Sequence, residues 1–180
     1  MSDEELIERI IRTNDSYLFS QLYDRYVRVV YNKCLGFSKS KEEAQDLTHD
    51  IFLKLFVKLR SFKGKSKFST WLYSFTYNHC VNYVQRDSEK RKPKVPIDNY
   101  LEKFTEEEIP DDSIFNLKTE KLKKVLELID VNDKVILLLK YQDDMSIKEI
   151  QAILEIGESA VKMRIKRAKE RVLLTYNNLK

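Results

Sequence analysis

The stretch SIKEIQAILEIGESAVKMRIKRAKER, residues 146–171, is the one on which the interpretation of the whole chain depends. Ser146, with Glu149 three residues later, forms a capping box that begins a helix, and apolar residues then recur at helical spacing. Residues 155–157 break this helix, and we expect Gly157 to supply the backbone freedom for the turn. A second, basic helix follows. Two helices joined by a short turn, the second one basic, are typical of a DNA-binding helix-turn-helix.

The charges of the second helix distinguish it from an ordinary solvent-exposed hairpin. Six basic residues and one acid, Glu170, lie between Lys162 and Arg171. Exposed helices usually mix the two signs, because opposite charges four residues apart attract. A polyanionic partner accounts for the excess of bases. The apolar stripe expected on the same helix comprises Ala160, Val161, Ile165, Ala168 and Val172.

Composition predicts a helical protein with real hydrophobic cores. The chain has 180 residues, 42% of them hydrophobic, with only 3 Gly and 3 Pro, too few turn-forming residues for an all-β fold. No apolar run is long enough to span a bilayer, and the acidic N-terminus lacks a signal peptide, so we expect a cytoplasmic protein without membrane insertion. Cys34 and Cys80 fall within helical patterns and are expected to pack as small apolar residues rather than to form a disulfide.

A change of composition predicts a flexible linker at residues 87–112. All three prolines lie in it, and its charge changes from basic to acidic along the segment. Extended or disordered segments have this composition. The sequence therefore predicts an all-α protein with two small helical domains, residues 1–86 and 113–180, joined by this linker.

The N-terminal domain is expected to begin with three capped helices. Ser2 and Glu5 form one capping box, Ser40 and Glu43 form another, and Asp15 can cap the helix between them. On the third helix, three polar residues one turn apart lie off the apolar face. By themselves these residues favour solvent exposure, and their two acids are the only paired carboxylates that an enzyme could use. They are Asp46, Asp50 and Lys54.

A lysine-rich loop and an aromatic helix, about residues 68–86, complete this domain. Single-stranded nucleic acid binds where bases stack on rings and lysines follow the phosphates. Asn78 and Asn82 share a face of the helix, and asparagine can read a base edge. The same rings can equally form a core, and the same asparagines can be ordinary surface residues. The lysines of the loop, which Gly64 turns, are Lys63, Lys65 and Lys67.

The C-terminal domain is expected to contain two further helices before the helix-turn-helix. The first starts near Ser113 and continues through Ile129, and the second is capped by Asn132 and runs to Tyr141. No phosphate-binding glycine loop, nucleophile elbow or metal-ligand spacing is present in the sequence. We therefore expect no cofactor, no metal and no enzymatic activity.

Taken in order, these segments resemble the bacterial RNA polymerase sigma factors of the extracytoplasmic-function class. Three stretches look like successive parts of the family's region two, and one looks like its region four. The stretches are LFSQLYDRYVRVVY, EEAQDLTHDIFLKLF, FKGKSKFSTWLYSFTYNHCVNYVQR and, for region four, VILLLKYQDDMSIKEIQAILEIGESAVKMRIKRAKERV.

The resemblance implies three partners: core RNA polymerase, promoter DNA and an anti-sigma factor. It implies that Asp46, Asp50 and Lys54 bind the polymerase. The implied contacts to the minus-ten element, where the domain opens the duplex and captures an unstacked base, are Lys63, Lys65, Lys67, Tyr77, Asn78, Asn82 and Arg86. The implied contacts to the minus-thirty-five element are Glu158, Ser159, Lys162, Met163, Arg164, Lys166 and Arg167.

The chain departs from the family at a few positions. Glu155 stands where relatives often have glycine, Gly157 stands where a serine cap is common, and His49 with Asp50 replaces a frequent Gln-Glu pair. The main alternative is a stand-alone helix-turn-helix regulator whose N-terminal half dimerises or senses a signal. Such a regulator would bind duplex DNA tightly without polymerase, commonly at a palindromic site.

Overall fold

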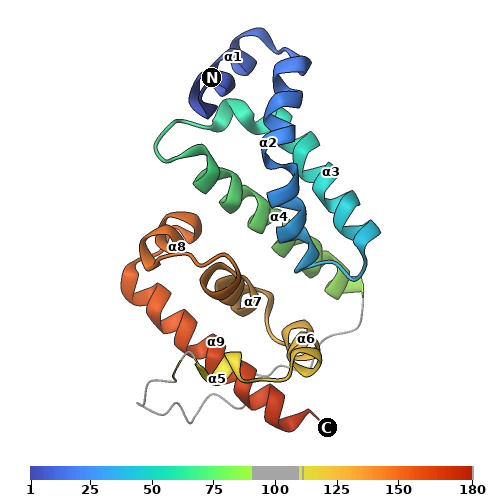
Figure 1. The fold of residues 1–180 in the computed structure, drawn as a ribbon, viewed down its shortest axis with the longest axis vertical. Helices are drawn as coiled ribbons and strands as arrows, with labels where there is room; N and C mark the ends of the chain where they lie inside the picture. Colours follow the sequence, from blue (N-terminus) through green and yellow to red (C-terminus); the bar gives the residue numbers. More distant parts are fainter. Residues whose placement is uncertain (91–109, 111, 180) are drawn as a thin grey trace. The chain divides into compact units, whose positions relative to one another are not determined.

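The computed structural model describes residues 1–90, 110 and 112–179, and every regular element in these residues is helical (Figure 1). The chain divides into two compact units, Met1–Val84 and Gln85–Lys180. Most of the predicted linker, residues 87–112, lies outside the described residues, so the predicted domain boundaries stay predictions.

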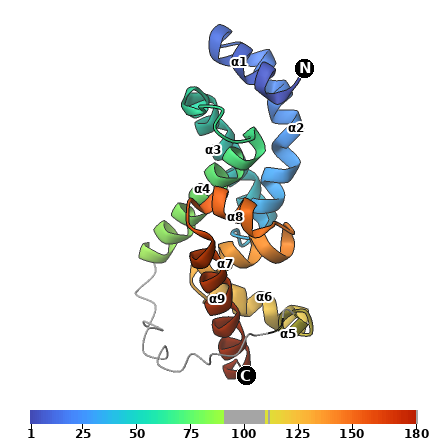
Figure 2. The same ribbon diagram turned by 90° about the vertical axis from the view of Figure 1, so that its left-hand side faces the viewer.

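The N-terminal unit is built from helices of about three to six turns and one 3-10 turn. In Figure 1 and Figure 2, α2 and α3 run side by side, and α1 lies at one end of this pair. The predicted helix ending at Arg86 continues to Lys90. The elements are α1(Asp3–Thr13), α2(Ser16–Leu35), α3(Lys41–Lys58), η1(Leu59–Ser61) and α4(Phe68–Lys90).

Aliphatic side chains from all four helices form the core of this unit, and aromatic pairs join α2 to its neighbours. Phe19 of α2 packs edge-on against Phe56 of α3, with ring centroids 4.8 Å apart. Tyr26 of α2 packs in the same way against Phe68 of α4, at 5.4 Å. Such pairs add to the hydrophobic stabilisation from area burial. The fully buried aliphatic residues include Leu6, Leu22, Ile51, Leu55 and Leu72.

The caps of α1 and α2 agree with the sequence, whereas the cap of α3 differs in one half. Ser2 and Glu5 form the predicted capping box, and Asp15 accepts hydrogen bonds from the start of α2. Ser40 accepts from the backbone N–H of Glu43 as predicted. The Glu43 carboxylate, however, accepts from the N–H of Lys39 at 2.9 Å, so the reciprocal half of that capping box is wrong.

The first helices of the C-terminal unit are shorter than the sequence predicted. The helix expected from Ser113 is divided at residues 116–118. Asp130, not Asn132, caps the next helix, and the backbone N–H of Asn132 is the donor to its side chain. A π-helical turn then follows directly. The elements are α5(Asp112–Phe115), α6(Thr119–Leu128), α7(Val131–Leu137), η3(Leu138–Gln142), α8(Ile147–Leu154) and α9(Glu158–Asn178).

The predicted helix-turn-helix is formed by α8 and α9, but its turn is built differently. The Ser146–Glu149 capping box begins α8 as predicted. Glu155, with φ 54°, is the residue in the left-handed region, whereas Gly157 has φ −70° and an extended backbone that any residue can adopt. The expectation that Gly157 supplies the backbone freedom is therefore wrong. Ala160 is exposed and does not belong to the apolar stripe of α9.

Replacing Glu155 by glycine should stabilise the C-terminal unit by about 1 kcal/mol, because a left-handed backbone is unfavourable for a residue with a Cβ. Urea unfolding of the full chain, followed by circular dichroism, measures the change. Gly157→Ala is the matched control, because a Cβ there meets no atom within 4 Å and no special backbone angle is needed. A loss of stability in Glu155→Gly would show that the Glu155 side chain, not the backbone, sets this turn.

Candidate nucleic-acid interface

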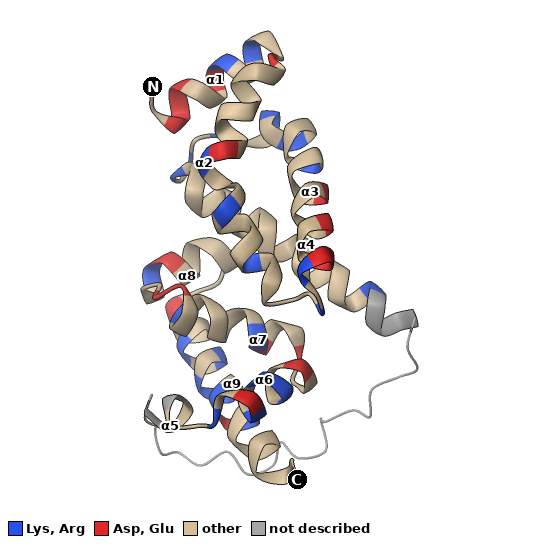
Figure 3. Ribbon diagram, turned by 45° about the vertical axis from the view of Figure 1, so that its right-hand side comes forward, with Lys and Arg blue, Asp and Glu red and all other residues tan. Residues whose placement is uncertain are grey.

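The exposed surface of α9 carries most of the residues that the sequence assigned to duplex DNA. On its first two turns every residue except Val161 and Ile165 is exposed, and Figure 3 shows basic residues along the helix. Glu158, Lys162 and Lys166 are spaced four residues apart and so lie along one face. The charge of Arg164 contributes to lowering the pKa of the Asp133 carboxyl of α7, though less than Arg171 does. The exposed members of the predicted set are Glu158, Ser159, Lys162, Met163, Arg164 and Arg167, and Lys166 is half-buried.

Two of these residues form an ion pair on the first turn of α9. Lys162 Nζ lies 2.6 Å from Glu158 Oε1, and both side chains are more than half exposed. This contact holds the pKa of the Glu158 carboxyl below its ordinary value, first through the hydrogen bond and then through the charge of Lys162. Exposed pairs of this kind contribute little to stability. The pair can therefore open at small cost when Lys162 meets another acceptor.

Other bases of α9 serve the fold rather than the surface. Arg171 Nη1 donates to Asp133 Oδ2 and ties α9 to α7. Burial raises the pKa of the Asp133 carboxyl, and the hydrogen bond from Arg171 opposes that rise. Lys169 is only 8% exposed. The basic residues of α9 thus divide into an exposed group near its start and an anchoring group farther along.

Of the residues predicted to meet the minus-ten element, all but Tyr77 are exposed in the structure. Asn78 and Asn82 are both exposed on α4, as are Arg86 and the three lysines of the preceding loop. Gly64 turns that loop with φ +66°. Tyr77 is only 3% exposed, and its ring packs edge-on against Phe37 at 5.8 Å. Because its ring is closed off inside the unit, Tyr77 does not belong to the surface.

A row of rings lies beside the two asparagines. Trp71 and Phe75, one turn apart on α4, are stacked with centroids 5.5 Å apart and an interplanar angle of 19°. His79 continues the row, 4.6 Å from Phe75. All three are partly exposed. The aromatic residues of α4 therefore include both core rings and partly exposed rings. The stacking of bases on the exposed rings stays a prediction.

The polar stripe of α3 lies on the exposed side of that helix, and it contains two apolar residues that sequence reasoning missed. Asp46, Asp50 and Lys54 are all exposed. Leu53 and Val57 lie among them with 64% and 73% of their surfaces exposed. Exposed large apolar side chains that are grouped together mark interaction sites. The sequence could have indicated Leu53 and Val57, because both fall outside the apolar stripe of α3.

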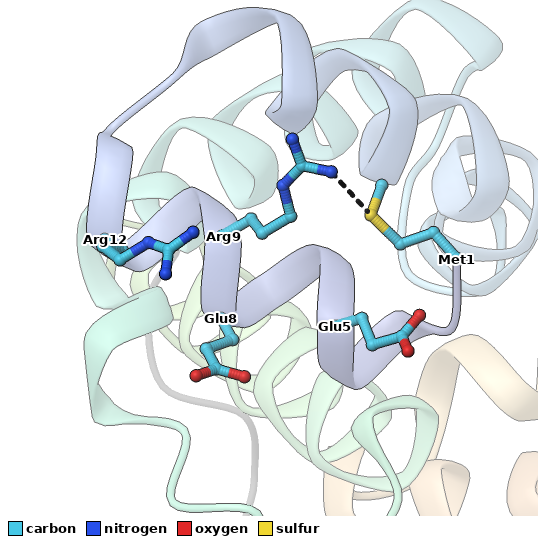
Figure 4. Close-up of a pocket in the computed structure, with 5 residues that line it drawn as sticks. All are labelled: Met1, Glu5, Glu8, Arg9 and Arg12. Carbon is cyan, nitrogen blue, oxygen red and sulfur yellow. Dashed lines mark hydrogen bonds between the residues drawn. The ribbon is translucent and has the colours of Figure 1, made fainter.

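The remaining features of the described residues do not assemble a catalytic centre. The cavity shown in Figure 4 is an open depression of about 420 Å³ on α1, and its lining residues come from the N-terminus and one helix. Two acids and two bases line it, so their charges balance. No group of three His, Cys, Asp or Glu side chains suited to a metal occurs in the described part of the chain. Nor does any described helix combine the length and apolar character needed to cross a membrane. The depression is lined by Met1, Glu5, Glu8, Arg9 and Arg12.

Comparison with known proteins connects these surfaces to one family. Residues 22–90 match the model for Sigma-70 region 2, and residues 119–172 match the model for Sigma-70, region 4. These are the segments that carry the α3 and α4 surfaces and the helix-turn-helix. Their order along the chain is the one that the sequence predicted.

Sequences and solved structures of individual sigma factors are also similar to this chain. The ECF RNA polymerase sigma factor SigW of Bacillus subtilis is 28% identical over 172 residues, covering 89% of each chain. The solved structure of CnrH, in complex with the cytosolic domain of CnrY, has 18% identity and a TM-score of 0.64, covering 99% of each chain. The sigma factor RpoE of Bartonella quintana, in complex with the anti-sigma factor NepR, has 21% identity and a TM-score of 0.58, covering 88% of this chain and 96% of that one.

The chain belongs to the Sigma-70 family, in its extracytoplasmic-function class. It is a sigma factor that directs RNA polymerase to promoters for the initiation of transcription. A stand-alone regulator is not favoured, because the N-terminal half itself matches a sigma region rather than a dimerisation or sensor domain.

Proposed function

We propose that three exposed surfaces divide the work of this sigma factor: α3 binds core polymerase, the loop and exposed side of α4 open the minus-ten element, and the start of α9 reads the minus-thirty-five element. The observation that carries this assignment is the exposure of the matching residues. All but two of the side chains assigned from the sequence are exposed, although each of their helices also contributes to a core. The two others are Tyr77, which is buried, and Lys166, which is half-buried.

On α3, an apolar centre with charged flanks supports the polymerase assignment. Leu53 and Val57 would provide desolvated contact area, while Asp46, Asp50 and Lys54 would set orientation and partner choice. Protein interfaces commonly combine an apolar centre with a polar rim in this way. The protein would thus act by binding and not by catalysis, in the cytoplasm where the polymerase works. A region-two surface of this kind is also open to an anti-sigma factor such as the one bound in the RpoE structure.

On α4, Asn78 is proposed to contact a base after the duplex opens. Asn78→Ala should weaken productive promoter binding by about 1–3 kcal/mol through loss of one base contact. The measurement is open-complex formation by the holoenzyme on a duplex promoter and on one with a pre-melted bubble. The bubble should recover part of the loss, since unpairing is then already done. Asn32→Ala, an exposed asparagine of α2, is the matched control; equal behaviour of the two variants would remove Asn78 from the site.

On α9, Lys162 is proposed to read a base edge and Lys166 to meet a phosphate, because a recognition helix enters the groove by its N-terminal part. Lys166→Ala should weaken binding on all promoters alike and reduce the slope of log affinity against log salt by roughly 0.9. Lys162→Ala should instead change which minus-thirty-five sequence is preferred. Holoenzyme binding to a randomised upstream element, at several salt concentrations, measures both effects.

The control for these two lysines is Lys124→Ala, an exposed base on α6 of the same unit. It should leave both the sequence preference and the salt slope unchanged. If Lys162→Ala and Lys166→Ala also keep the parent preference and the parent slope, α9 does not read the DNA. In that case the assignment of the minus-thirty-five contacts fails, even if the chain still binds polymerase.

A further inference from the structure

An ion pair lies at the exposed start of α9, the part of a recognition helix that meets base edges in the major groove. Lys162 Nζ lies 2.6 Å from Glu158 Oε1, and the two side chains are 63% and 59% exposed. Glu158 is the first residue of α9, and Lys162 lies one turn farther along. The pair therefore presents a hydrogen-bond donor and an acceptor side by side, away from the core of the unit.

Glu158 is an unexpected residue at a surface that meets DNA, because the phosphates repel a carboxylate. It is the only acid between residues 158 and 169, where the sequence has five bases. The bases of this helix can bind phosphates, whereas a carboxylate can bind DNA only through a hydrogen-bond donor. In the major groove those donors are the amino groups of cytosine and adenine. The chemistry of Glu158 thus commits it to one of these two groups.

The major-groove edge of a G·C base pair carries the complementary groups at a matching distance. Guanine O6 and cytosine N4 are hydrogen-bonded to each other, so they lie about 2.9 Å apart. The ammonium of Lys162 has three N–H donors. One can stay on Glu158 Oε1 while the others donate to guanine O6 and N7. The second carboxylate oxygen of Glu158, Oε2, can then accept from the remaining N–H of cytosine N4, and the ion pair need not open.

An A·T pair fits less well, although it also places an amino group beside a carbonyl. Thymine offers the ammonium a single acceptor, O4, next to a methyl group, whereas guanine offers two acceptors. On adenine, a carboxylate that accepts from N6 would also lie beside N7, which is another acceptor. The donor and acceptor of this ion pair therefore favour a G·C pair over an A·T pair.

We propose that Glu158 and Lys162 act as a unit that reads one G·C base pair of the minus-thirty-five element, with Lys162 on guanine and Glu158 on cytosine. This assignment rests on the proposed role of α9 at that element, and it adds the identity of a base pair, its orientation and a function for the acid. Because the two charges cancel, the pair adds little net attraction for the phosphates of random DNA. On a C·G pair the carboxylate would instead face guanine O6, and the repulsion between two acceptors would add to specificity.

Exchanging the two residues tests the orientation. Glu158→Lys combined with Lys162→Glu keeps the net charge, the spacing and the two opposite charges, but it reverses donor and acceptor. Holoenzyme binding to a randomised upstream element is the measurement. The parent should prefer G·C at one position by about tenfold, and the exchanged variant should prefer C·G at that same position. An exchanged variant that keeps the parent preference would overturn the proposal.

Glu158→Gln provides a second test, which does not depend on how well the exchanged helix forms. Glutamine keeps the shape of the side chain but removes the charge that neutralises Lys162. The preference for G·C should fall several-fold. The slope of log affinity against log salt should become steeper by roughly 0.9, because Lys162 then attracts a phosphate. A variant with both the parent preference and the parent slope would overturn the role of Glu158.

The matched control is Glu120→Lys combined with Lys123→Glu, which exchanges an exposed ion pair on α6 with an N–O distance of 3.3 Å. It should keep the parent preference and the parent salt slope. A parent that prefers an upstream sequence in which no G·C pair responds to the exchange of Glu158 and Lys162 overturns this assignment alone. A parent that prefers no upstream sequence, although it binds core polymerase, overturns the proposed role of α9 and this assignment with it.

Discussion

Replacing Arg171 by methionine should destabilise the C-terminal unit by about 3–5 kcal/mol, because it leaves a buried carboxylate without its partner. Asp133 is 7% exposed, and Arg171 donates to it from α9. Methionine keeps much of the apolar stem, so lost packing contributes little. Amide hydrogen exchange of α7 and α9 in the full chain is the measurement. Protection in these helices should fall by at least roughly 100-fold.

The stability of the Arg171→Met variant should change with pH in a defined direction. In the folded protein the pKa of Asp133 is already raised by burial, with the hydrogen bond from Arg171 opposing the rise. Without Arg171 the pKa rises further, so the folded state binds the proton more tightly than the unfolded state does. Stability then falls as pH rises through the folded pKa. The deficit of Arg171→Met should thus be larger in neutral than in mildly acidic buffer.

The control is the double variant Asp133→Asn with Arg171→Met. It removes both charges and should recover most of the stability, since an uncompensated buried charge is the main source of the loss. If the single and double variants lose protection equally, at neutral and acidic pH alike, the pair does not anchor α9 to α7. The orientation of the recognition helix would then depend on apolar packing alone.

Replacing Leu53 by aspartate should weaken binding to core polymerase by about 2–4 kcal/mol, roughly 30-fold or more. Leu53 is 64% exposed in the free protein, so the change leaves the core of the unit intact. At the centre of an interface the new carboxylate would be desolvated without a partner. Titration of labelled protein with purified core polymerase measures the affinity. Asp46→Ala and Asp50→Ala should have smaller effects, because charges at a rim contribute less.

Tyr17→Asp is the matched control for this surface. Tyr17 is an exposed apolar residue of the same unit, at 70%, but it lies on α2 outside the proposed surface. The substitution should leave polymerase affinity unchanged, and circular dichroism should show parent helicity for both variants. Unchanged affinity of Leu53→Asp would exclude the exposed side of α3 as the docking surface.

Capping residues and apolar spacing in the sequence predicted where the helices lie. They predicted the details of the caps and of the turn less well. Ser2 and Ser146 each have a glutamate three residues on, and both capping boxes form. At Ser40 the N–H of Lys39 offers the Glu43 carboxylate an alternative, and the box is incomplete. The turn of the helix-turn-helix was misplaced for a different reason. The presence of glycine at residue 157 said nothing about which residue of the turn takes the left-handed conformation.

The candidate surfaces were predictable where exposure follows from helical spacing alone, and not where distant segments decide it. Asn78 and the early residues of α9 fall outside the apolar stripes of their own helices. Tyr77 is buried where Lys33 of α2 and Phe37, two residues beyond the end of α2, contact its ring, and no local pattern reveals that contact.

Transcription in vitro from a promoter library, with purified core polymerase and the reduced full chain, tests the central claim most directly. We predict transcripts that require both proteins and that start downstream of one shared pair of minus-ten and minus-thirty-five sequences. Core polymerase alone should give no such selection. The account would be contradicted if the chain selected no promoters with core polymerase yet bound a palindromic duplex tightly by itself.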